Sequence, residues 1–436
     1  MPASLNTIFD FVALLQNQGK SPEFLRKLQE KKLRHLLTQT YAHVPFYKYR
    51  FKTVGLTPQD INGLEDFSQL PITCKHELQA APQEEILSQN IDIQTCKVFA
   101  TSGTTGIPLK TYFSPFDSRF KNLGWIRVFW NTGMKPWQRT AAFIGQKQIN
   151  ERKSWYEYLG LWRRREISTW SDIEIWLDTL KRWNPHALLG YVMTLKILAE
   201  EKQKAGERPV KPRFIFHSSA LLDQGSRESL EAAFGCEITD IYGSDEAGCI
   251  AWECKSCQGY HLNQDLLIVE VLKQGRPASP GESGEVIITN LHSYAMPFIR
   301  YAQGDVVTLS TKKPVCGCTF PLIEQIEGRT DDFIQLKNGR KISPHPVYHS
   351  IDPIPGIRKW RLIQEEIDIF KLEIEASPDY STDSETAIRK NLEELFKLSI
   401  NLNIVLKNKI SMEPGQKFRS VSSKVGLNPE EEVLKT

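Results

Sequence analysis

A run of hydroxyl and glycine residues at positions 101–106 has the composition of an anion-binding loop. It reads Thr-Ser-Gly-Thr-Thr-Gly and follows a short apolar stretch, Val98-Phe99. Backbone N–H groups of such a loop can turn toward a phosphate, while the hydroxyls add donors or a metal ligand. The Gly-Lys-Ser/Thr ending of a Walker P-loop is absent. By composition alone, a plain surface turn is the alternative.

Two later stretches place carboxylates beside aromatic rings. Tyr-Gly-Ser-Asp-Glu at 242–246 follows an apolar run, so Tyr242 could stack on a base and Glu246 could hold Mg²⁺. The stretch 297–305 ends on Asp305, whose carboxylate could accept two hydrogen bonds from ribose hydroxyls. Taken singly, each stretch is a common turn with solvated acids. Together they favour a nucleotide site.

Four of the eight cysteines form two close pairs. Cys254-x-x-Cys257 and Cys316-x-Cys318 offer four thiolates, and His261 follows the first pair. Disulfides are rare in a long chain that opens without a secretory signal. The pairs therefore predict a structural zinc site, with buried free thiols as the alternative. The remaining cysteines are isolated and are predicted to be core residues: Cys74, Cys96, Cys236 and Cys249.

The elements that must position these residues alternate between helices and short apolar strands. One helix is predicted from the cap Ser21 to about Val44, and another from the cap Ser171 to Asn184. Strands are predicted at 214–216, 238–242, 266–272 and 286–289, and residues 281–310 are rich in strand and turn patterns. This alternation indicates an α/β fold with a β subdomain.

The 436 residues suit two or three domains at about 150 residues each. A boundary is predicted near Gly328-Arg329, which divides the chain into residues 1–327 and 328–436. The second part carries strand patterns at 357–363, 367–374 and 404–406 and a charged amphipathic helix at 384–398. These elements suit a small α+β domain.

Composition excludes several classes of protein. A net charge of +3 gives no basic field for nucleic acid, and hydrophobic residues at 40% are ordinary for a globular chain. No apolar stretch approaches the roughly 20 residues that span a bilayer. We therefore expect a cytoplasmic enzyme that binds neither nucleic acid nor membrane.

Four ordered motifs resemble those of the adenylate-forming superfamily, which includes acyl-CoA synthetases, nonribosomal adenylation domains and firefly luciferase. They are the loop at 101–106, Tyr-Gly-Ser-Asp-Glu, Arg-Tyr-x-x-Gly-Asp and Gly-Arg-Thr-Asp-Asp at 328–332. Details at 44–47, 295–301 and 416–421 look like the phenylacetate–CoA ligase branch, particularly its CapK-like proteins. The match spans about residues 30–425. It implies a large N-terminal adenylate-forming domain and a small mobile C-terminal domain.

The resemblance also implies roles for individual residues. Tyr242 would stack on adenine, Asp305 would hold the ribose, and Arg329 would lie near the phosphates or ribose. Asp331 would be the hinge of the C-terminal domain, and Lys417 would contact the acid and the α-phosphate. The ATP-binding segments would be Thr101, Ser102, Gly103, Thr104, Thr105 and Gly106, then Gly243, Ser244, Asp245 and Glu246. Thr105 and Glu246 would join Lys417 in catalysis, with Glu246 as the Mg²⁺ ligand.

For zinc, the resemblance selects among the candidate ligands. Related sequences tend to carry a cysteine followed by Gly-x-His, which corresponds here to Gly259-Tyr260-His261. The predicted ligands are therefore Cys254, His261, Cys316 and Cys318, with Cys257 as the alternative to His261.

The implied activity is Mg²⁺- and ATP-dependent adenylation of a small carboxylic acid, followed by acyl transfer to coenzyme A. Transfer to an amine, an alcohol or a carrier-protein thiol is the alternative within enzymes, and a non-catalytic scaffold is the alternative outside them. Dimers are common in this branch, so a homodimer is compatible with the resemblance. The basic run Arg163-Arg164-Arg165 is interpreted as a solvated loop, with contact to CoA phosphates as the alternative.

Overall fold

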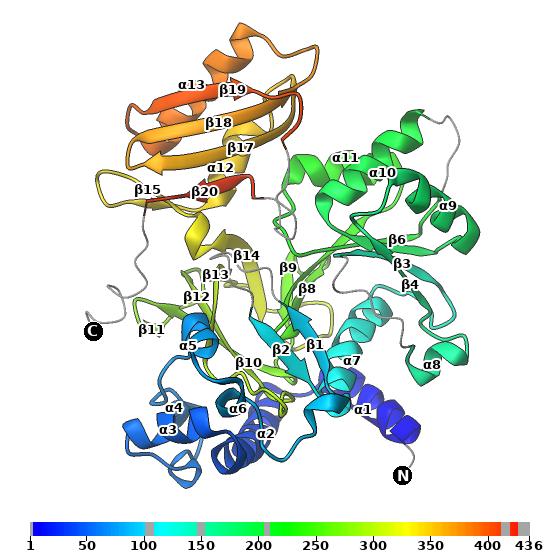
Figure 1. Ribbon diagram of the computed structural model, residues 1–436, viewed down its shortest axis with the longest axis vertical. Coiled ribbons are helices and arrows are strands. Elements are labelled where there is room, and N and C mark those ends of the chain that lie inside the picture. Colours follow the sequence, from blue (N-terminus) through cyan, green and yellow to red (C-terminus); the bar gives the residue numbers. More distant parts are fainter. Residues whose placement is uncertain (1–2, 101–108, 146–152, 205–209, 411–418, 426–436) are drawn as a thin grey trace.

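The computed structural model describes residues 3–100, 109–145, 153–204, 210–410 and 419–425. Its larger part is built on one mixed sheet of twelve strands, and its C-terminal part on a separate four-stranded sheet. Figure 1 shows the C-terminal part, coloured yellow to red, above the ends of β13 (Tyr301–Leu309) and β14 (Leu322–Arg329). None of the described helices is long and apolar enough to cross a membrane.

Three helices open the chain: α1 (Ala3–Asn17), α2 (Pro22–His43) and α3 (Pro45–Thr53). As predicted, Ser21 caps α2, because its side chain accepts a hydrogen bond from the backbone N–H of Phe24. The predicted end of α2 is confirmed as well. The chain does not leave the helical state there, however, since Pro45 starts α3 at once.

This N-terminal region is tied to residues far along the chain. One anchor point is the carboxylate of Asp265, which forms an ion pair with Arg127 at 2.9 Å; both side chains are fully buried. The side-chain amide of Asn17 donates to the same carboxylate at 3.0 Å. The hydroxyl of Tyr47 donates to the carbonyl of Pro297 at 3.1 Å. Each bond satisfies a buried polar group, so the helices dock in one register on the later strands.

The parallel half of the large sheet has the order β7-β6-β5-β3-β4. Its strands alternate side chains between two hydrophobic clusters. Phe143, Leu188 and Ile215 pack with α9, α10 and α11 on one face, whereas Ala142 and Phe216 pack with α7 on the other. The bounds are β3 Thr140–Ile144, β4 Arg164–Ser168, β5 Ala187–Gly190, β6 Phe214–Ser218, β7 Ile238–Ser244, α7 Pro115–Asn131, α9 Ile173–Trp183, α10 Val192–Lys204 and α11 Gln224–Phe234.

Two predictions about this half are corrected. The cap of α9 is Asp172 rather than Ser171, and no side-chain hydrogen bond caps the helix. The run Arg163-Arg164-Arg165 does not form a loop, because Arg164 begins β4, the edge strand of the sheet. An edge strand tolerates charged side chains, since its outer side faces water.

Beyond β7 the sheet is antiparallel, in the order β11-β10-β12-β13-β14-β9-β8-β7. Its bounds are β8 Gly248–Cys254, β9 Gly259–Leu262, β10 Leu267–Lys273, β11 Arg276–Pro277 and β12 Ser283–Asn290. A separate hairpin of β1 (Lys97–Ala100) and β2 (Lys110–Phe113) flanks the described ends of the predicted phosphate loop. Short helical turns complete this part: η1 Pro58–Asp60, α4 Leu64–Phe67, α5 Lys75–Ala80, α6 Gln83–Ile86, η2 Ile93–Thr95 and α8 Trp155–Tyr158.

The C-terminal part has the sheet order β19-β18-β17-β20, packed with two helices around its own hydrophobic cluster. The predicted strands and helix of this part are all present. The bounds are β15 Ile334–Gln335, β16 Lys341–Ile342, α12 Pro344–Ile351, β17 Ile357–Glu366, β18 Ile369–Ala376, α13 Thr382–Phe396, β19 Asn401–Leu406 and β20 Val421–Ser423. The division after residue 327 stays a prediction.

Candidate active site

The hairpin of β7 and β8 begins the site, at the point where the sheet changes from parallel to antiparallel. The ladder shifts register between Tyr242 and Gly243. A Cβ atom on Gly243 would lie 2.5 Å from the carbonyl oxygen of Gly248, so only glycine allows the two strands to approach here. The hydroxyl of Ser244 accepts the backbone N–H of Ala247 at 3.1 Å and closes the turn.

Two tyrosine–carboxylate pairs lie beyond this turn. The hydroxyl of Tyr242 donates to Asp305 at 2.8 Å, and the hydroxyl of Tyr301 donates to Glu246 at 3.1 Å. Arg329 forms an ion pair with Asp305 at 3.3 Å across the β13–β14 ladder. The structure therefore brings together four predicted residues, Tyr242, Glu246, Asp305 and Arg329, with Tyr301.

Burial sets the protonation of these pairs. Burial, strengthened by the neighbouring carboxylate, raises the pKa of Tyr242 and of Tyr301 well above the ordinary value. Both phenols are therefore neutral donors near pH 7. Glu246 is only 7% exposed and lies in a pocket of low solvation, where a cation would stabilise its charge.

Arg329 reaches Asp305 because Gly304 leaves room for it. Gly304 has a φ of +71°, and a Cβ atom there would lie 2.8 Å from Nη2 of Arg329. Asp331 belongs to the 3₁₀ turn Thr330–Asp332, directly after β14. Asp332 of the same turn pairs with Arg419 at 2.9 Å. The turn thus connects the end of the large sheet to a residue of the C-terminal part.

Lys121 on α7 is a site residue that the sequence did not reveal. Its ammonium donates to the backbone carbonyl of Asp245 at 2.7 Å and lies over the rings of Phe99 and Phe113. Burial lowers its pKa, and the charges of Asp245 and Glu246 counteract the shift. A single lysine on a helix gives no pattern that predicts this position.

The predicted phosphate loop, Thr101 to Gly106, and Lys417 lie outside the described residues. Gly243, Ser244 and Asp245 lie in or beside the turn. Neither the Ser244 nor the Asp245 side chain contacts the two tyrosine–carboxylate pairs in a described hydrogen bond.

A second cluster gathers Cys254, Cys257, His261 and Cys316, whose ligand atoms all lie within 4.8 Å of one another. The set differs from the predicted one by a single residue, because Cys257 is present together with His261, and Cys318 is not a member. Cys318 instead packs against the core cluster beneath the sheet. The pairing of β9 with β14 brings His261 to the loop that carries Cys316.

The donor set fits zinc. Nδ1 of His261 lies 3.1 Å from the carbonyl oxygen of Phe320, so this nitrogen carries the proton and Nε2 presents its lone pair toward Cys316, 3.2 Å away. The backbone N–H of Val315 donates to the sulfur of Cys257, as it would to a thiolate. Burial lowers the pKa of His261, which keeps the imidazole neutral and able to ligate.

Sequence comparison finds relatives along most of the chain. A phenylacetate–coenzyme A ligase of Thermus thermophilus is 28% identical over 356 residues, which cover 77% of each protein. Protein CapK of Staphylococcus aureus is 23% identical over 91% of this chain and 88% of its own length. Residues 334–424 match the family model of the CapK C-terminal domain. The chain is a homologue of the phenylacetate–coenzyme A ligases and CapK.

Solved structures show that this homologue has the fold of the adenylate-forming CoA ligases. 2-Hydroxyisobutyryl-CoA ligase in its postadenylation state aligns with a TM-score of 0.78 at 18% identity, covering 96% of this chain and 93% of the other. The same enzyme in its thioesterification state aligns with a TM-score of 0.64. An amide bond synthetase from Marinactinospora thermotolerans also shares the fold, with a TM-score of 0.56, 15% identity and coverage of 77% and 70%.

Proposed function

We propose that the protein adenylates a carboxylic acid with ATP, releases pyrophosphate, and passes the acyl group to coenzyme A. The observation that carries the proposal is the convergence of Tyr242, Glu246 and Asp305 at the carboxyl end of β7, in a homologue of phenylacetate–coenzyme A ligases. In sheets with parallel strands, ligands bind beyond the carboxyl ends of those strands. At β7 the sheet also changes from parallel to antiparallel pairing.

Tyr242 and Asp305 would bind the nucleoside. The ring of Tyr242 would stack on adenine, while its hydroxyl keeps the carboxylate of Asp305 in place. A carboxylate has about four lone-pair positions, so Asp305 can accept ribose hydroxyls in addition to Tyr242 and Arg329. Arg329 would then lie beside the ribose or the phosphates.

Glu246 would hold Mg²⁺ with one carboxylate oxygen, while the hydroxyl of Tyr301 orients the side chain. Bound there, Mg²⁺ would neutralise part of the phosphate charge. A carboxylic acid is a poor nucleophile toward an anionic triphosphate, so the site needs cations and N–H donors rather than a covalent nucleophile. On the motif match we assign these donors to the loop Thr101–Gly106, including Thr105, and to Lys417.

We further propose that the C-terminal part lies as it does after adenylation. The TM-score is higher for the relative in its postadenylation state than in its thioesterification state, 0.78 against 0.64. Asp331, in the turn between β14 and β15, would be the hinge for the change between the two arrangements. Closure of this part would exclude water from the acyl adenylate.

Zinc would be held by Cys254, Cys257, His261 and Cys316 in a structural role. The first three ligands belong to the β8–β9 hairpin, and Cys316 belongs to the connection between β13 and β14. The metal would thereby fasten the hairpin that begins at Gly248 to the strands that carry Asp305 and Arg329. Cytoplasmic location and a homodimer stay predictions from the sequence.

The decisive experiment measures pyrophosphate release with ATP and Mg²⁺ against a panel of aryl, alkyl and amino acids, each with and without coenzyme A. Acid-dependent release that increases with coenzyme A is expected. The Lys417→Ala variant should lose release while its thermal unfolding midpoint stays nearly unchanged. Undiminished pyrophosphate release in the Lys417→Ala variant would contradict the assignment of that lysine.

Transfer to an amine is the second candidate, because an amide bond synthetase shares the fold. Acid-dependent release that coenzyme A leaves unchanged would favour it, and amines would then be added to the panel. If no acid of the panel causes release and the folded protein does not bind ATP, the catalytic proposal is wrong and a scaffold is favoured.

A further inference from the structure

Four residues form a row at the amino ends of the parallel strands. Arg213, His186, Arg139 and Arg163 directly precede β6, β5, β3 and β4, which are neighbours in that order. The ladders pair the first residues of these strands with one another, so the preceding residues lie level. Adjacent strands are about 4.8 Å apart, and the row therefore extends over about 14 Å. We call these residues the basic row.

Arginines of this region converge on one indole ring. The guanidinium carbons of Arg139 and Arg165 lie 5.6 Å from the ring centroid of Trp183, and that of Arg163 lies 5.9 Å away. Trp183 is fixed in place, because its Nε1–H donates to the carbonyl of Thr140 at 3.2 Å. The ring thus holds three cations beside one another.

Two donors of the basic row have no acceptor. The Nε atoms of Arg139 and Arg163 are buried and lack a hydrogen-bond partner within the described part of the chain. Buried donors are normally satisfied, so an acceptor for this pair must come from outside the described residues, and a bound anion is one such acceptor.

Within the described residues, no carboxylate pairs with an arginine of the row. None of its arginines, nor Arg165, forms a salt bridge with a described residue. The nearby acids Glu166 and Asp178 pair with Arg164 and Arg182 instead. Burial, followed by the charges of the three arginines, lowers the pKa of the imidazole of the row. Like charges gathered in this way repel one another until an anion binds.

The ends of helices explain only one member of the row. Cations favour helix C-termini, and the Nη2 atom of Arg139 donates to the carbonyl of Asn184, the C-cap of α9, at 2.9 Å. Arg163 and Arg213 make no described hydrogen bond of this kind through their side chains. Their placement therefore calls for another cause.

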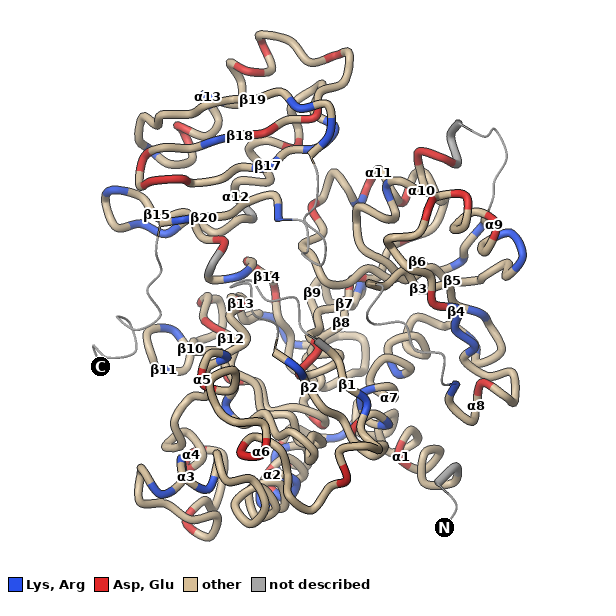
Figure 2. Tube along the Cα trace, in the orientation of Figure 1, with Lys and Arg blue, Asp and Glu red and all other residues tan. Residues whose placement is uncertain are grey.

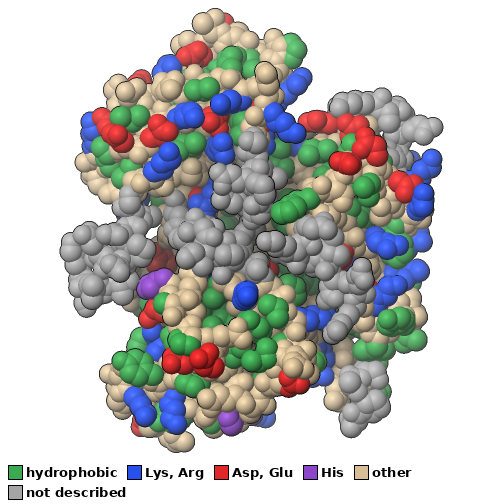
Figure 3. All heavy atoms as spheres, in the orientation of Figure 1, with side chains coloured by type: hydrophobic (Ala, Val, Ile, Leu, Met, Phe, Trp, Pro, Cys, Tyr) green, Lys and Arg blue, Asp and Glu red, His purple; other side chains and the backbone are tan. Residues whose placement is uncertain are grey.

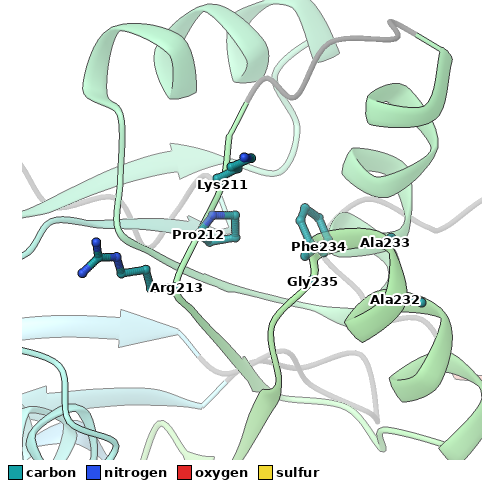
Figure 4. Close-up of a pocket in the computed structure, with 7 residues that line it drawn as sticks. All are labelled: Lys211, Pro212, Arg213, Ala232, Ala233, Phe234 and Gly235. Atoms are coloured by element: carbon teal, nitrogen blue, oxygen red, sulfur yellow. The ribbon is translucent and has the colours of Figure 1, made fainter.

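Further basic residues and a cavity lie around the row. Figure 2 shows basic segments gathered beside β4, β5 and α9, and Figure 3 shows the corresponding side chains along the right-hand edge of the molecule. A cavity of about 490 Å³ lies at the β6 end, between residues 211–213 and the C-terminal end of α11. In Figure 4 the side chain of Arg213 extends away from Phe234, the aromatic wall of this cavity.

We propose that the basic row is a second anion site, which binds a small molecule carrying two or more phosphate groups. Guanidinium groups recognise phosphate oxygens with paired N–H donors, and a span of about 14 Å suits several phosphates rather than one. The site lies at the opposite end of the parallel strands from Tyr242. Its ligand is therefore distinct from the nucleotide of the proposed reaction.

The first test uses the wild-type protein and inorganic tripolyphosphate at about 0.15 M salt, where weak surface attraction is screened. The pKa of His186 is followed by NMR, and the His186→Gln variant identifies its signals. A bound anion favours the imidazolium, so the pKa of His186 should rise by about 1. Tripolyphosphate resembles part of ATP, and a readout at His186 separates the row from the nucleotide site. An unchanged His186 at saturation would overturn the proposal.

The second test compares two double variants that lose the same charge. Arg163→Gln/Arg213→Gln removes both ends of the row, whereas Lys181→Gln/Arg182→Gln removes exposed cations on the last turn of α9. Calorimetry should show tripolyphosphate affinity falling at least about 10-fold in the first variant and less than about 3-fold in the second. Arg163→Lys/Arg213→Lys should recover part of the loss. Equal losses in the two glutamine variants would show general attraction only, and the proposal would fail.

Discussion

Individual residues of the candidate site act in pairs, in which a neutral tyrosine orients a charged carboxylate. Burial raises the pKa of Tyr242 and Tyr301, so each phenol remains a donor over the whole physiological range of pH. The carboxylates can then rotate little. Asp305 has Arg329 as a cationic partner, whereas Glu246 has Lys121 only as a neighbouring charge. Glu246 is therefore the carboxylate that a metal ion would stabilise most.

The first prediction concerns Glu246→Gln. The amide oxygen can still accept from Tyr301, but the negative charge is lost, so Mg²⁺ binds weakly and pyrophosphate release should fall about 100-fold. Rates measured over a range of Mg²⁺ concentrations check this. The control is Tyr301→Phe, which keeps the charge of Glu246 and should lose less than about 10-fold. If the two variants lose activity equally, orientation rather than charge is the role of Glu246.

The sequence revealed those site residues that share a short motif. Tyr242 and Glu246 are four positions apart, and Asp305 follows an arginine and a glycine in a recognisable order. Lys121 and the Tyr301–Glu246 contact were not predictable, because α7 and β13 approach the hairpin only in the folded sheet. The same reason explains Cys257: spacing allowed several ligand sets, and only the folded structure shows which four side chains lie together.

At the scale of elements, the site depends on the β7–β8 hairpin, whose strands approach closely at Gly243, and on the proposed zinc, which would fasten β8 and β9 to the connection before β14. The β8–β9 hairpin, including its turn, carries three of the four ligands, and Cys316 lies in a connection without regular structure. Removing the fourth ligand should loosen this connection against the hairpin. The loss of stability would be transmitted to β13 and β14, which carry Asp305 and Arg329.

The second prediction uses the adjacent cysteines 316 and 318 as a matched pair. Cys316→Ser should lower the zinc content of the purified protein from about one equivalent and lower the thermal unfolding midpoint, since metal binding contributes to folding. Cys318→Ser should leave both nearly unchanged. Metal analysis and thermal denaturation check this. Zinc loss in both variants would instead support the ligand set predicted from the sequence, which contains both cysteines.

The basic row shows why some sites cannot be read from a sequence. Its members are residues 139, 163, 186 and 213, which belong to segments that share no motif. Only the strand order brings them level. The run at 163–165 is recognisable in the sequence because it is contiguous, but only Arg163 and Arg165 of this run lie over the ring of Trp183.

At the scale of the whole molecule, two acids lie close together where the C-terminal part meets the large part. Asp352, the C-cap of α12, lies near Asp223, the N-cap of α11, with Lys196 as the neighbouring cation. Burial and the charge of Asp223 raise the pKa of Asp352 to about 7. Because the raised pKa favours the protonated form, the contact is stable at acidic pH and weakens as pH rises through about 7.

The third prediction follows from this weakening of the contact at higher pH. Small-angle scattering of the wild-type protein should show the two parts separating more readily at pH 8 than at pH 6. Asp352→Asn should abolish the pH dependence and keep the parts together at pH 8, since the amide can still accept from the indole N–H of Trp360. Asp368→Asn, which removes a charge elsewhere in the C-terminal part, should behave as wild type. A wild-type profile that is flat between pH 6 and 8 would contradict the role of this contact.

The anchoring of the N-terminal helices has a consequence for synthesis on the ribosome. Asn17 and Tyr47 find their partners at Asp265 and Pro297, so the first helices emerge about 250 residues before the surfaces that cover them. At about 5–20 residues per second, this delay lasts about 12–50 s. During that time the leucine-rich face of α2 is exposed to the cell. A nascent chain of this protein should therefore be a long-lived client of chaperones that bind at the ribosome exit.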